Sequence, residues 1–232
     1  MTAIFAHRGH HHEAPENSVA AVAAARDIRA DGVEIDVWLT ADGHLVVNHD
    51  RTVGGLALPA SRRADLVHGL AAPAELGEVL TAAGGLRINV EIKSTRSRAY
   101  NLAVAEAVAG FLDDSPWSSQ CLVSSFSLEI CEAVRAASPQ RRVGWLIQRQ
   151  GAAQALDRVS DSALTSLHLP FARVREPVAR AARDRGVDLH VWTPNLERDI
   201  GRMLELEVGA LITDDVPLAQ RMRDSSGLPT SG

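Results

Sequence analysis

Several features that mark particular classes of protein are missing from this sequence. The only two cysteines, Cys121 and Cys131, provide neither a disulfide framework nor a metal-binding spacing, so both are expected to be small, buried or half-buried side chains in a reducing compartment. Lys and Arg are scattered and the formal net charge is −5, so the basic surface that nucleic acids require is lacking. No signal-peptide pattern or membrane-spanning apolar run is found. These absences predict a soluble, cytoplasmic protein with no nucleic-acid partner and no stable membrane insertion, and they leave its oligomeric state open.

What the sequence does contain is a regular alternation of short apolar or β-branched runs with Ala-rich helical stretches. Such alternation predicts parallel strands joined by helices, which is an α/β fold. Eight strand–helix units in 232 residues favour a closed (β/α)8 TIM barrel over an open sheet. The strands are expected at residues 3–7, 33–39 with an extension at 44–50, 86–93, 121–126, 141–147, 164–169, 188–193 and 210–214.

The expected barrel is a single domain over residues 1–224. The last residues, 225–232, read "SSGLPTSG" and predict a disordered tail, because they are too polar to join a core. Residues 51–72 show no clear period, and we expect them to form a short irregular insertion above the barrel after the second strand. Local signals support the division into helices, with Ser18, Ser127 and Pro73 at helix starts and Gly32, Gly84 and Gly186 at helix ends.

Polar residues occur where the predicted strands end, which is where barrels of this kind carry their chemistry. Glu34 and Asp36 lie two apart on one strand, so their side chains point to the same side; the same holds for Glu91 and Lys93. Charges that point into a barrel are unfavourable unless they are paired or coordinated. Further polar or aromatic residues of these strands and strand ends are His7, Arg8, His49, Asp50, Ser124, Ser125, His168, His190 and Trp192.

The three carboxylates predict a metal site. Glu34, Asp36 and Glu91 come from neighbouring strands and would repel one another unless a cation lay between them. An all-oxygen set of ligands suits one hard divalent cation, Ca²⁺ or Mg²⁺. Arg8 and Lys93 add positive charge that attracts a phosphate group.

Two histidines flank this predicted metal site. His7 and His49 follow neighbouring strands and suit a general acid and a general base working near neutral pH. Together with the cation and the phosphate contacts, they predict hydrolysis of a phosphoester. The residues do not decide which histidine is the acid, or whether water or a neighbouring hydroxyl attacks first.

Five segments, in this order and spacing, resemble the glycerophosphodiester phosphodiesterase family: "AHRGHHHEAPENS", "GVEIDVWLTADGHLVVNHD", "NVEIK", "HVWTPN" and "VGALITDDVP". The resemblance implies a (β/α)8 barrel and metal-dependent hydrolysis of glycerophosphodiesters to glycerol 3-phosphate and an alcohol. It also implies a place in glycerol and lipid metabolism. Matched residue by residue, it assigns catalysis to His7 and His49, metal ligation to Glu34, Asp36 and Glu91, phosphate contacts to Arg8 and Lys93, and an aromatic substrate contact to Trp192.

Two departures from the family pattern bear on the substrate. The insertion at 51–72 is shorter than usual and keeps only "RTV" of the typical text, and residues 10–12 are three histidines where the family has small or varied residues. A larger substrate therefore stays possible, as in a lysophospholipase D or a glycerophosphoinositol phosphodiesterase. A barrel that binds phosphate compounds without turnover is the alternative from another class.

Several polar residues also have a plain structural interpretation. Glu91 and Lys93 can form a simple ion pair, and His10–His12 are expected at the surface, because consecutive side chains in a loop splay apart rather than converge on a metal. Glu16 and Asn17 are expected to have a structural role near the first helix, although bracing the metal ligands is the alternative. Asp214 and Asp215 are expected to begin the last helix, near its positive end.

Overall fold

The computed structural model describes residues 1–66 and 72–225, and its centre is a closed barrel of parallel strands. The strands run in the order β1-β12-β11-β10-β9-β8-β7-β2, and pairing of β1 with β2 closes the ring. This confirms the predicted (β/α)8 barrel. Its strands are β1 (Ala3–His7), β2 (Gly32–Leu39), β7 (Arg87–Ile92), β8 (Cys121–Ser125), β9 (Arg142–Leu146), β10 (Ser166–Pro170), β11 (Asp188–Trp192) and β12 (Ala210–Thr213).

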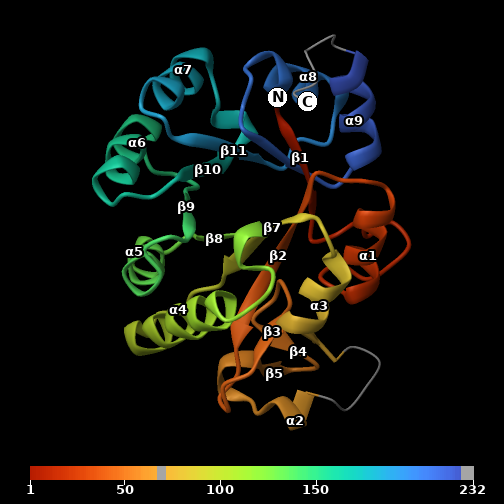
Figure 1. Ribbon diagram of the computed structural model, residues 1–232, viewed down its shortest axis with the longest axis vertical. Helices are drawn as coiled ribbons and strands as arrows, with labels where there is room; N and C mark the ends of the chain where they lie inside the picture. The colour runs from red at the N-terminus through yellow and green to blue at the C-terminus, as the bar shows by residue number, and fades with distance from the viewer. Residues whose placement is uncertain (67–71, 226–232) are drawn as a thin grey trace.

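A helix follows each barrel strand, and Figure 1 shows these helices arranged around the strands. The apolar core lies between the two layers: Val33, Ile35 and Val37 of β2 are fully buried and belong to it. Because side chains alternate along a strand, Glu34 and Asp36 point to the other side of β2. The helices are α1 (Val19–Asp27), α3 (Leu76–Ala83), α4 (Arg98–Asp113), α5 (Leu128–Ala137), α6 (Ala152–Asp161), α7 (Glu176–Asp184), α8 (Glu197–Glu205) and α9 (Val216–Ser225), with short 3₁₀ turns η2 (Ser118–Gln120) and η3 (Phe171–Arg173).

Most of the predicted helix-end signals agree with the structure. The Ser18 and Ser127 hydroxyls accept hydrogen bonds from the backbone N–H groups of the first turns of α1 and α5. Gly84 and Gly186 have φ values of +59° and +65° at the ends of α3 and α7. Two expectations were wrong. Pro73 precedes α3, which begins after Glu75 with a capping box, and Gly32 begins β2, where a Cβ would lie 2.5 Å from the Phe5 ring.

The segment after β2 extends the sheet beyond the barrel. As expected, residues 45–47 form an extension, β3 (Leu45–Val47), which pairs antiparallel with β2 and with β6 (Ala74–Glu75). The insertion is more regular than predicted, because Trp38 and Val46 pack against its Leu58 and Leu66 in a small core of their own. It contains a hairpin of β4 (Thr52–Val53) and β5 (Leu56–Ala57), a 3₁₀ turn η1 (Leu58–Ala60) and α2 (Arg63–Leu66), whereas residues 67–71 lie outside the described part.

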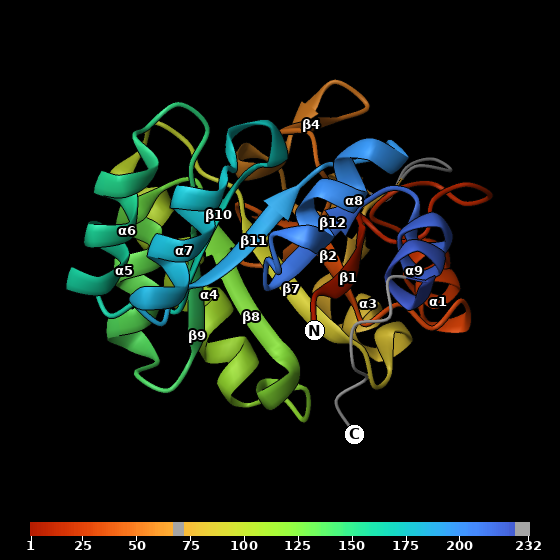
Figure 2. The ribbon, with the colours of Figure 1, turned by 90° about the horizontal axis from the view of Figure 1, so that it is seen from above.

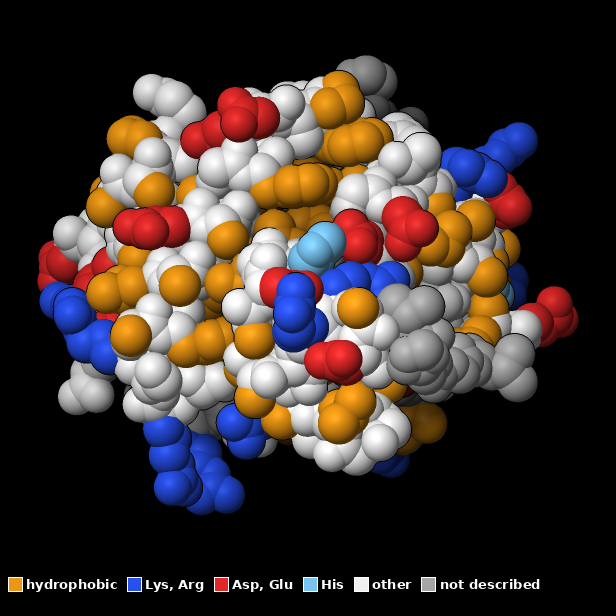
Figure 3. Space-filling model, turned by 90° about the horizontal axis from the view of Figure 1, so that it is seen from below, with side chains coloured by type: hydrophobic (Ala, Val, Ile, Leu, Met, Phe, Trp, Pro, Cys, Tyr) orange, Lys and Arg blue, Asp and Glu red, His pale blue; other side chains and the backbone are white. Residues whose placement is uncertain are grey.

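The insertion sits at one end of the barrel. Figure 2 shows β4 at the end toward which the arrow of β11 points. Figure 3 shows the face that carries the insertion, where acidic and basic side chains lie beside one another. Arg63 Nε of the insertion lies 3.3 Å from Glu75 Oε1, so an ion pair ties the insertion to the start of α3, and His44 Nδ1 lies 3.3 Å from the same oxygen.

The remaining sequence expectations concern the cysteines, the tail and the membrane. Both cysteines are free and buried, as expected. The predicted tail at 225–232 lies outside the described residues except for Ser225, which ends α9. Within residues 1–66 and 72–225, no helix combines the length and the apolar character that crossing a membrane requires.

Candidate active site

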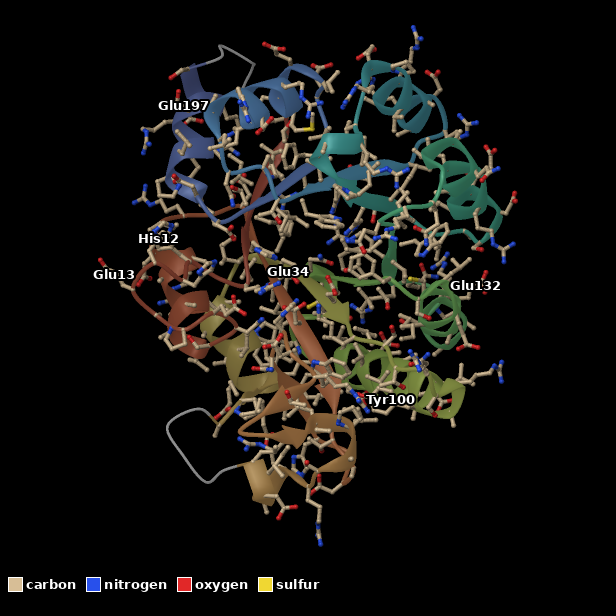
Figure 4. The ribbon with its side chains drawn as sticks, turned by 180° about the vertical axis from the view of Figure 1, so that it is seen from behind. His12, Glu13, Glu34, Tyr100, Glu132 and Glu197 are labelled. Atoms are coloured by element: carbon tan, nitrogen blue, oxygen red, sulfur yellow. The ribbon has the colours of Figure 1, made fainter. Side chains whose placement is uncertain are left out.

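One pocket of about 200 Å³ gathers every residue that the sequence singled out for catalysis or binding. Its lining includes side chains at or near the C-terminal ends of β1, β2, β7 and β11 and a side chain of the segment after β3. Seen from behind, the labelled Glu34 lies near the centre of the ring of strands (Figure 4). The eight predicted residues that line it are His7, Arg8, Glu34, Asp36, His49, Glu91, Lys93 and Trp192.

Glu34, Asp36 and Glu91 form a compact acidic cluster. The register of β2 and β7 places Asp36 opposite Glu91, and one oxygen of each carboxylate lies within 4.8 Å of the others. All three side chains are buried. Burial, followed by the charge of Asp36, raises the pKa of both Glu34 and Glu91, because each extra negative charge is harder to hold away from water.

Lys93 lies among these acids. Its Nζ is 2.7 Å from Asp36 Oδ1 and 2.7 Å from Glu91 Oε1. Burial acts to lower the pKa of Lys93, but the two carboxylates outweigh it and raise that pKa above its ordinary value. The ion pair considered as the simple alternative is therefore present, although it involves two acids rather than one.

The acidic cluster has the chemistry of a site for a hard metal ion. Its three carboxylates have one more formal charge than two cations neutralise, namely the Lys93 ammonium group and the Arg8 guanidinium, whose Nε lies 3.5 Å from Asp36 Oδ2. Burial is the first cause of the raised pKa values of Glu34 and Glu91, and repulsion from the neighbouring acids adds to it. The donors are all oxygens, as Mg²⁺ and Ca²⁺ require. The cluster of Glu34, Asp36 and Glu91 can hold a metal ion, and the donor set fits the predicted kind.

Asn17 braces one of the acids. Its Nδ2 donates to Asp36 Oδ2 over 2.8 Å, and its Oδ1 accepts from the Asp36 backbone N–H over 3.1 Å. The N-cap of α1 is Ser18, so Asn17 does not cap this helix with its side chain. Of the two roles considered for Asn17, the geometry matches the bracing of a carboxylate.

Arg8 reaches the pocket because of the turn that follows β1. Its own φ is +57° and that of Gly9 is +86°. A Cβ on Gly9 would lie 2.7 Å from the backbone of Ala21, so only glycine fits there. The turn directs the Arg8 backbone N–H to Glu34 Oε2 over 3.1 Å, and the guanidinium Nη1 donates to Glu16 over 2.9 Å.

The two histidines have different environments. His7 is paired through its Nδ1 with Asp214 Oδ1 over 2.7 Å, which leaves Nε2 as the ring nitrogen available to a substrate. His49 is more exposed, at 37% of its side chain, and its Nδ1 lies 3.0 Å from Asp50 Oδ1. Each ring thus has one nitrogen next to a carboxylate that orients it.

Asp214 is a site residue that the sequence interpretation missed. Its neighbour Asp215 is the one whose carboxylate accepts from a backbone N–H of α9, over 3.0 Å from Leu218. Partial burial acts to raise the pKa of Asp214, but the hydrogen bond and charge of His7, with help from Asn195, hold that pKa well below its usual range. Asp214 is therefore ionised at neutral pH and fixes the proton of His7 on Nδ1. No local pattern distinguishes it from a helix start.

Asn89 is a second missed residue. It is fully buried and lines the pocket, and neither its Oδ1 nor its Nδ2 has a hydrogen-bond partner among the described residues. It lies two residues before Glu91 on β7, so the same alternation that selected Glu91 and Lys93 points to it.

The aromatic wall of the pocket consists of two rings. Trp192 packs edge-on against Phe126 at 5.8 Å between ring centres, and both line the pocket. His168 and His190, considered either as pocket lining or as barrel filling, stack on each other at 4.3 Å deeper in the barrel and do not line this pocket.

Comparison with known proteins identifies the family. The sequence signature of the "Glycerophosphoryl diester phosphodiesterase family" matches residues 7–218. The chain belongs to this family. Membership confirms the resemblance seen in the sequence and the enzyme class, a phosphodiesterase of glycerophosphodiesters.

Individual family members align over nearly their whole length. A glycerophosphodiester phosphodiesterase of Caldanaerobacter subterraneus is 28% identical, with 92% of this chain and 94% of the relative covered. The crystal structure of a glycerophosphodiester phosphodiesterase from Thermotoga maritima has a TM-score of 0.78 at 27% identity and covers 96% of this chain and 99% of that one. A phosphodiesterase of Oleispira antarctica, solved with its product sn-glycerol-3-phosphate, has a TM-score of 0.85 at 22% identity, covers 97% of each chain and supports the barrel fold alone.

Proposed function

We propose that this chain hydrolyses glycerophosphodiesters to glycerol 3-phosphate and an alcohol, with His7 and His49 as the general acid and base. The observation that carries the proposal is the convergence of two carboxylate-oriented histidines, an acidic cluster and two cationic side chains in one pocket. The product bound by the relative from Oleispira antarctica, sn-glycerol-3-phosphate, is the product that this proposal expects. We assign the activity to a single domain over residues 1–224 and, as predicted from the sequence, to the cytoplasm.

Glu34, Asp36 and Glu91 are the residues that would hold one divalent cation, Mg²⁺ or Ca²⁺. When bound, such a cation supplies positive charge next to the phosphoryl oxygens and the attacking oxygen. Asn17 keeps the Asp36 carboxylate in place. A phosphate in the pocket would compete with Glu16 for Arg8 and with Glu91 for Lys93. Both cationic side chains could then stabilise the negative charge that develops on the phosphoryl oxygens.

Proton transfer is then the task of the histidines. With its proton on Nδ1 toward Asp214, the neutral form of the His7 imidazole has a lone pair on Nε2 that can accept a proton from the attacking hydroxyl or water. We assign to His49, which lines the same pocket, the protonation of the leaving alcohol, and exchange of the two roles is the alternative. Trp192 and Phe126 provide an apolar surface for the carbon atoms of the substrate.

Single-histidine variants test the proposed acid–base pair. His7→Ala and His49→Ala are each expected to lower kcat/KM for glycerophosphocholine by about 10²–10⁴-fold. His44→Ala is the matched control, because His44 lies outside the pocket, in the turn between β2 and β3. Near-normal turnover by either pocket variant would contradict the assignment.

A panel of substrates and metals tests the remaining parts. Removal of divalent cations with EDTA is expected to abolish activity, and addition of Mg²⁺ or Ca²⁺ to restore it. Glycerophosphocholine, glycerophosphoinositol and lysophosphatidylcholine are compared as substrates. Preference for the lyso-lipid would assign the chain to the lysophospholipase D type, and binding of all three without turnover would leave a phosphate-binding barrel.

A further inference from the structure

A second group of potential metal ligands lies beside the proposed active site. His7 Nδ1, His11 Nε2 and Asp214 Oδ1 lie within 4.8 Å of one another. Asp214 Oδ1 is 2.7 Å from the His7 nitrogen and 3.3 Å from the His11 nitrogen. The three side chains are between 22% and 34% exposed, so an ion can reach them from solvent.

We propose that His7, His11 and Asp214 form a site for a transition-metal ion with the preferences of Zn²⁺, and that an ion bound there inhibits the enzyme by occupying His7. The donors are two imidazole nitrogens and one carboxylate oxygen, a set that suits Zn²⁺ or Co²⁺ better than Mg²⁺ or Ca²⁺. The acidic cluster of Glu34, Asp36 and Glu91 offers only oxygens, so the two sites have opposite preferences.

Two of the three separations between ligand atoms can be compared with what such an ion requires. Ligand bonds of about 2.1 Å in a tetrahedron place ligand atoms roughly 3.4 Å apart. The His11–Asp214 separation already has this value within about 0.1 Å, and the His7–Asp214 separation has to open by roughly 0.7 Å. Three protein ligands leave the fourth position for water or an anion.

His11 reaches this position because the loop after β1 is anchored both on α1 and on the chain after β12. His10 donates its backbone N–H to Ala21 O over 2.8 Å, and His12 Nε2 lies 3.1 Å from the backbone oxygen of Asp214. Figure 4 shows His12 where this loop approaches the C-terminal elements. The expectation that the three consecutive histidines splay apart was wrong: the ring centres of His10 and His12 are 4.9 Å apart, and those of His11 and His12 are 6.3 Å apart. Of the three, His11 joins the cluster.

The inhibitory effect follows from the two nitrogens of one imidazole ring. With a metal ion on Nδ1, the ring proton must sit on Nε2, and the ring has no lone pair left to accept another proton. His7 can then no longer alternate between its neutral and protonated forms. This consequence rests on the proposed function, whereas metal binding itself does not.

Cobalt absorption spectroscopy tests the site directly. The protein is saturated with excess Mg²⁺ to fill the acidic cluster, and Co²⁺ is titrated into the wild type, His11→Gln and His12→Gln. His12→Gln is the matched control, because His12 is a neighbouring imidazole outside the ligand set and the amide N–H of Gln can still donate to the backbone oxygen of Asp214 that His12 contacts. We expect one equivalent of Co²⁺ with intense visible bands in the wild type and in His12→Gln, and an affinity at least tenfold lower in His11→Gln. Equal Co²⁺ affinity in His11→Gln and the wild type would overturn the site.

Zinc inhibition tests the link to His7. Hydrolysis is measured against Zn²⁺ concentration, and each variant is compared with its own rate without zinc. The half-inhibitory concentration is expected to rise at least tenfold in His11→Gln and to stay at the wild-type value in His12→Gln. Identical inhibition of His11→Gln and the wild type would overturn the link to His7. If no glycerophosphodiester is turned over, the proposed function fails, but the Co²⁺ spectra still decide whether the site exists.

Discussion

Replacing Asp214 with Asn tests how the reactive form of His7 is maintained. The two side chains have the same size, but Asn offers one oxygen and one NH₂ group instead of two oxygens. Asn195 Nδ2 donates to the Asp214 Oδ2 position over 2.5 Å, so the amide oxygen of the variant has to occupy that position. The amide NH₂ then faces His7 Nδ1, which must accept a hydrogen bond instead of donating one. The proton of His7 moves to Nε2, and the ring can no longer act as a base.

The expected loss has two parts. A hydrogen bond to a charged group is worth about 1.5–3 kcal/mol, which corresponds to about 10–150-fold in rate. The wrong tautomer of a catalytic histidine raises such a loss toward about 10⁴-fold. For Asp214→Asn we therefore expect kcat to fall by about 10²–10⁴-fold. KM should change by less than about threefold, because Asp214 acts through His7 and does not touch the substrate.

Steady-state hydrolysis of glycerophosphocholine at saturating Mg²⁺, measured as kcat and KM separately, is the assay. Asp215→Asn is the control, because it makes the same chemical change one residue later and Asn is as good a helix cap as Asp. A kcat for Asp214→Asn within a factor of three of the control would refute this account of His7. A fall confined to KM would mean that Asp214 acts on substrate binding instead.

Three further predictions concern stability. Gly9→Ala should unfold at lower denaturant than Gly43→Ala, since both have a φ near +90° but only Gly9 lies against another backbone segment; the excess loss should be about 1–3 kcal/mol. Burial, then the charge of His190, lowers the pKa of His168 well below 6.5. Below pH 6.5 the unfolded chain therefore binds a proton that the folded protein does not. The free energy of unfolding should fall by up to about 1.4 kcal/mol for each pH unit below that value. Urea titrations at several pH values should show a smaller slope for His168→Gln than for the wild type. Lys93→Met should lower the stability of the metal-free protein by about 3–5 kcal/mol, because buried carboxylates lose their counter-ion, and Mg²⁺ should restore part of the melting temperature. Equal stability of the two glycine variants, an unchanged pH slope, or a melting temperature of Lys93→Met that does not respond to Mg²⁺ would contradict the respective prediction.

Features that depend on neighbours along the chain could be predicted from the sequence. The eight strand–helix units follow from local periodicity, and the inward direction of Glu34, Asp36, Glu91 and Lys93 follows from the alternation of side chains along a strand. The convergence of these residues then follows from the barrel, because parallel strands bring their C-terminal ends to one end of the molecule. The same alternation places Asn89 on the side of β7 that carries Glu91, so Asn89 was also predictable from the sequence.

Contacts across the closure of the barrel were decided only by the tertiary structure. Asp214 and His7 are 207 residues apart in the chain and meet because β12 pairs with β1, in a register that sets Thr213 beside Ala6. His11 and Asp214 meet for the same reason, although both sit in segments whose local patterns indicate only a loop and a helix start. The position of Lys93 between two acids likewise depends on the exact packing of long side chains in the pocket. Periodicity fixes the side of a strand on which a residue lies, whereas the partner it meets there depends on strand register and loop path, which no local pattern encodes.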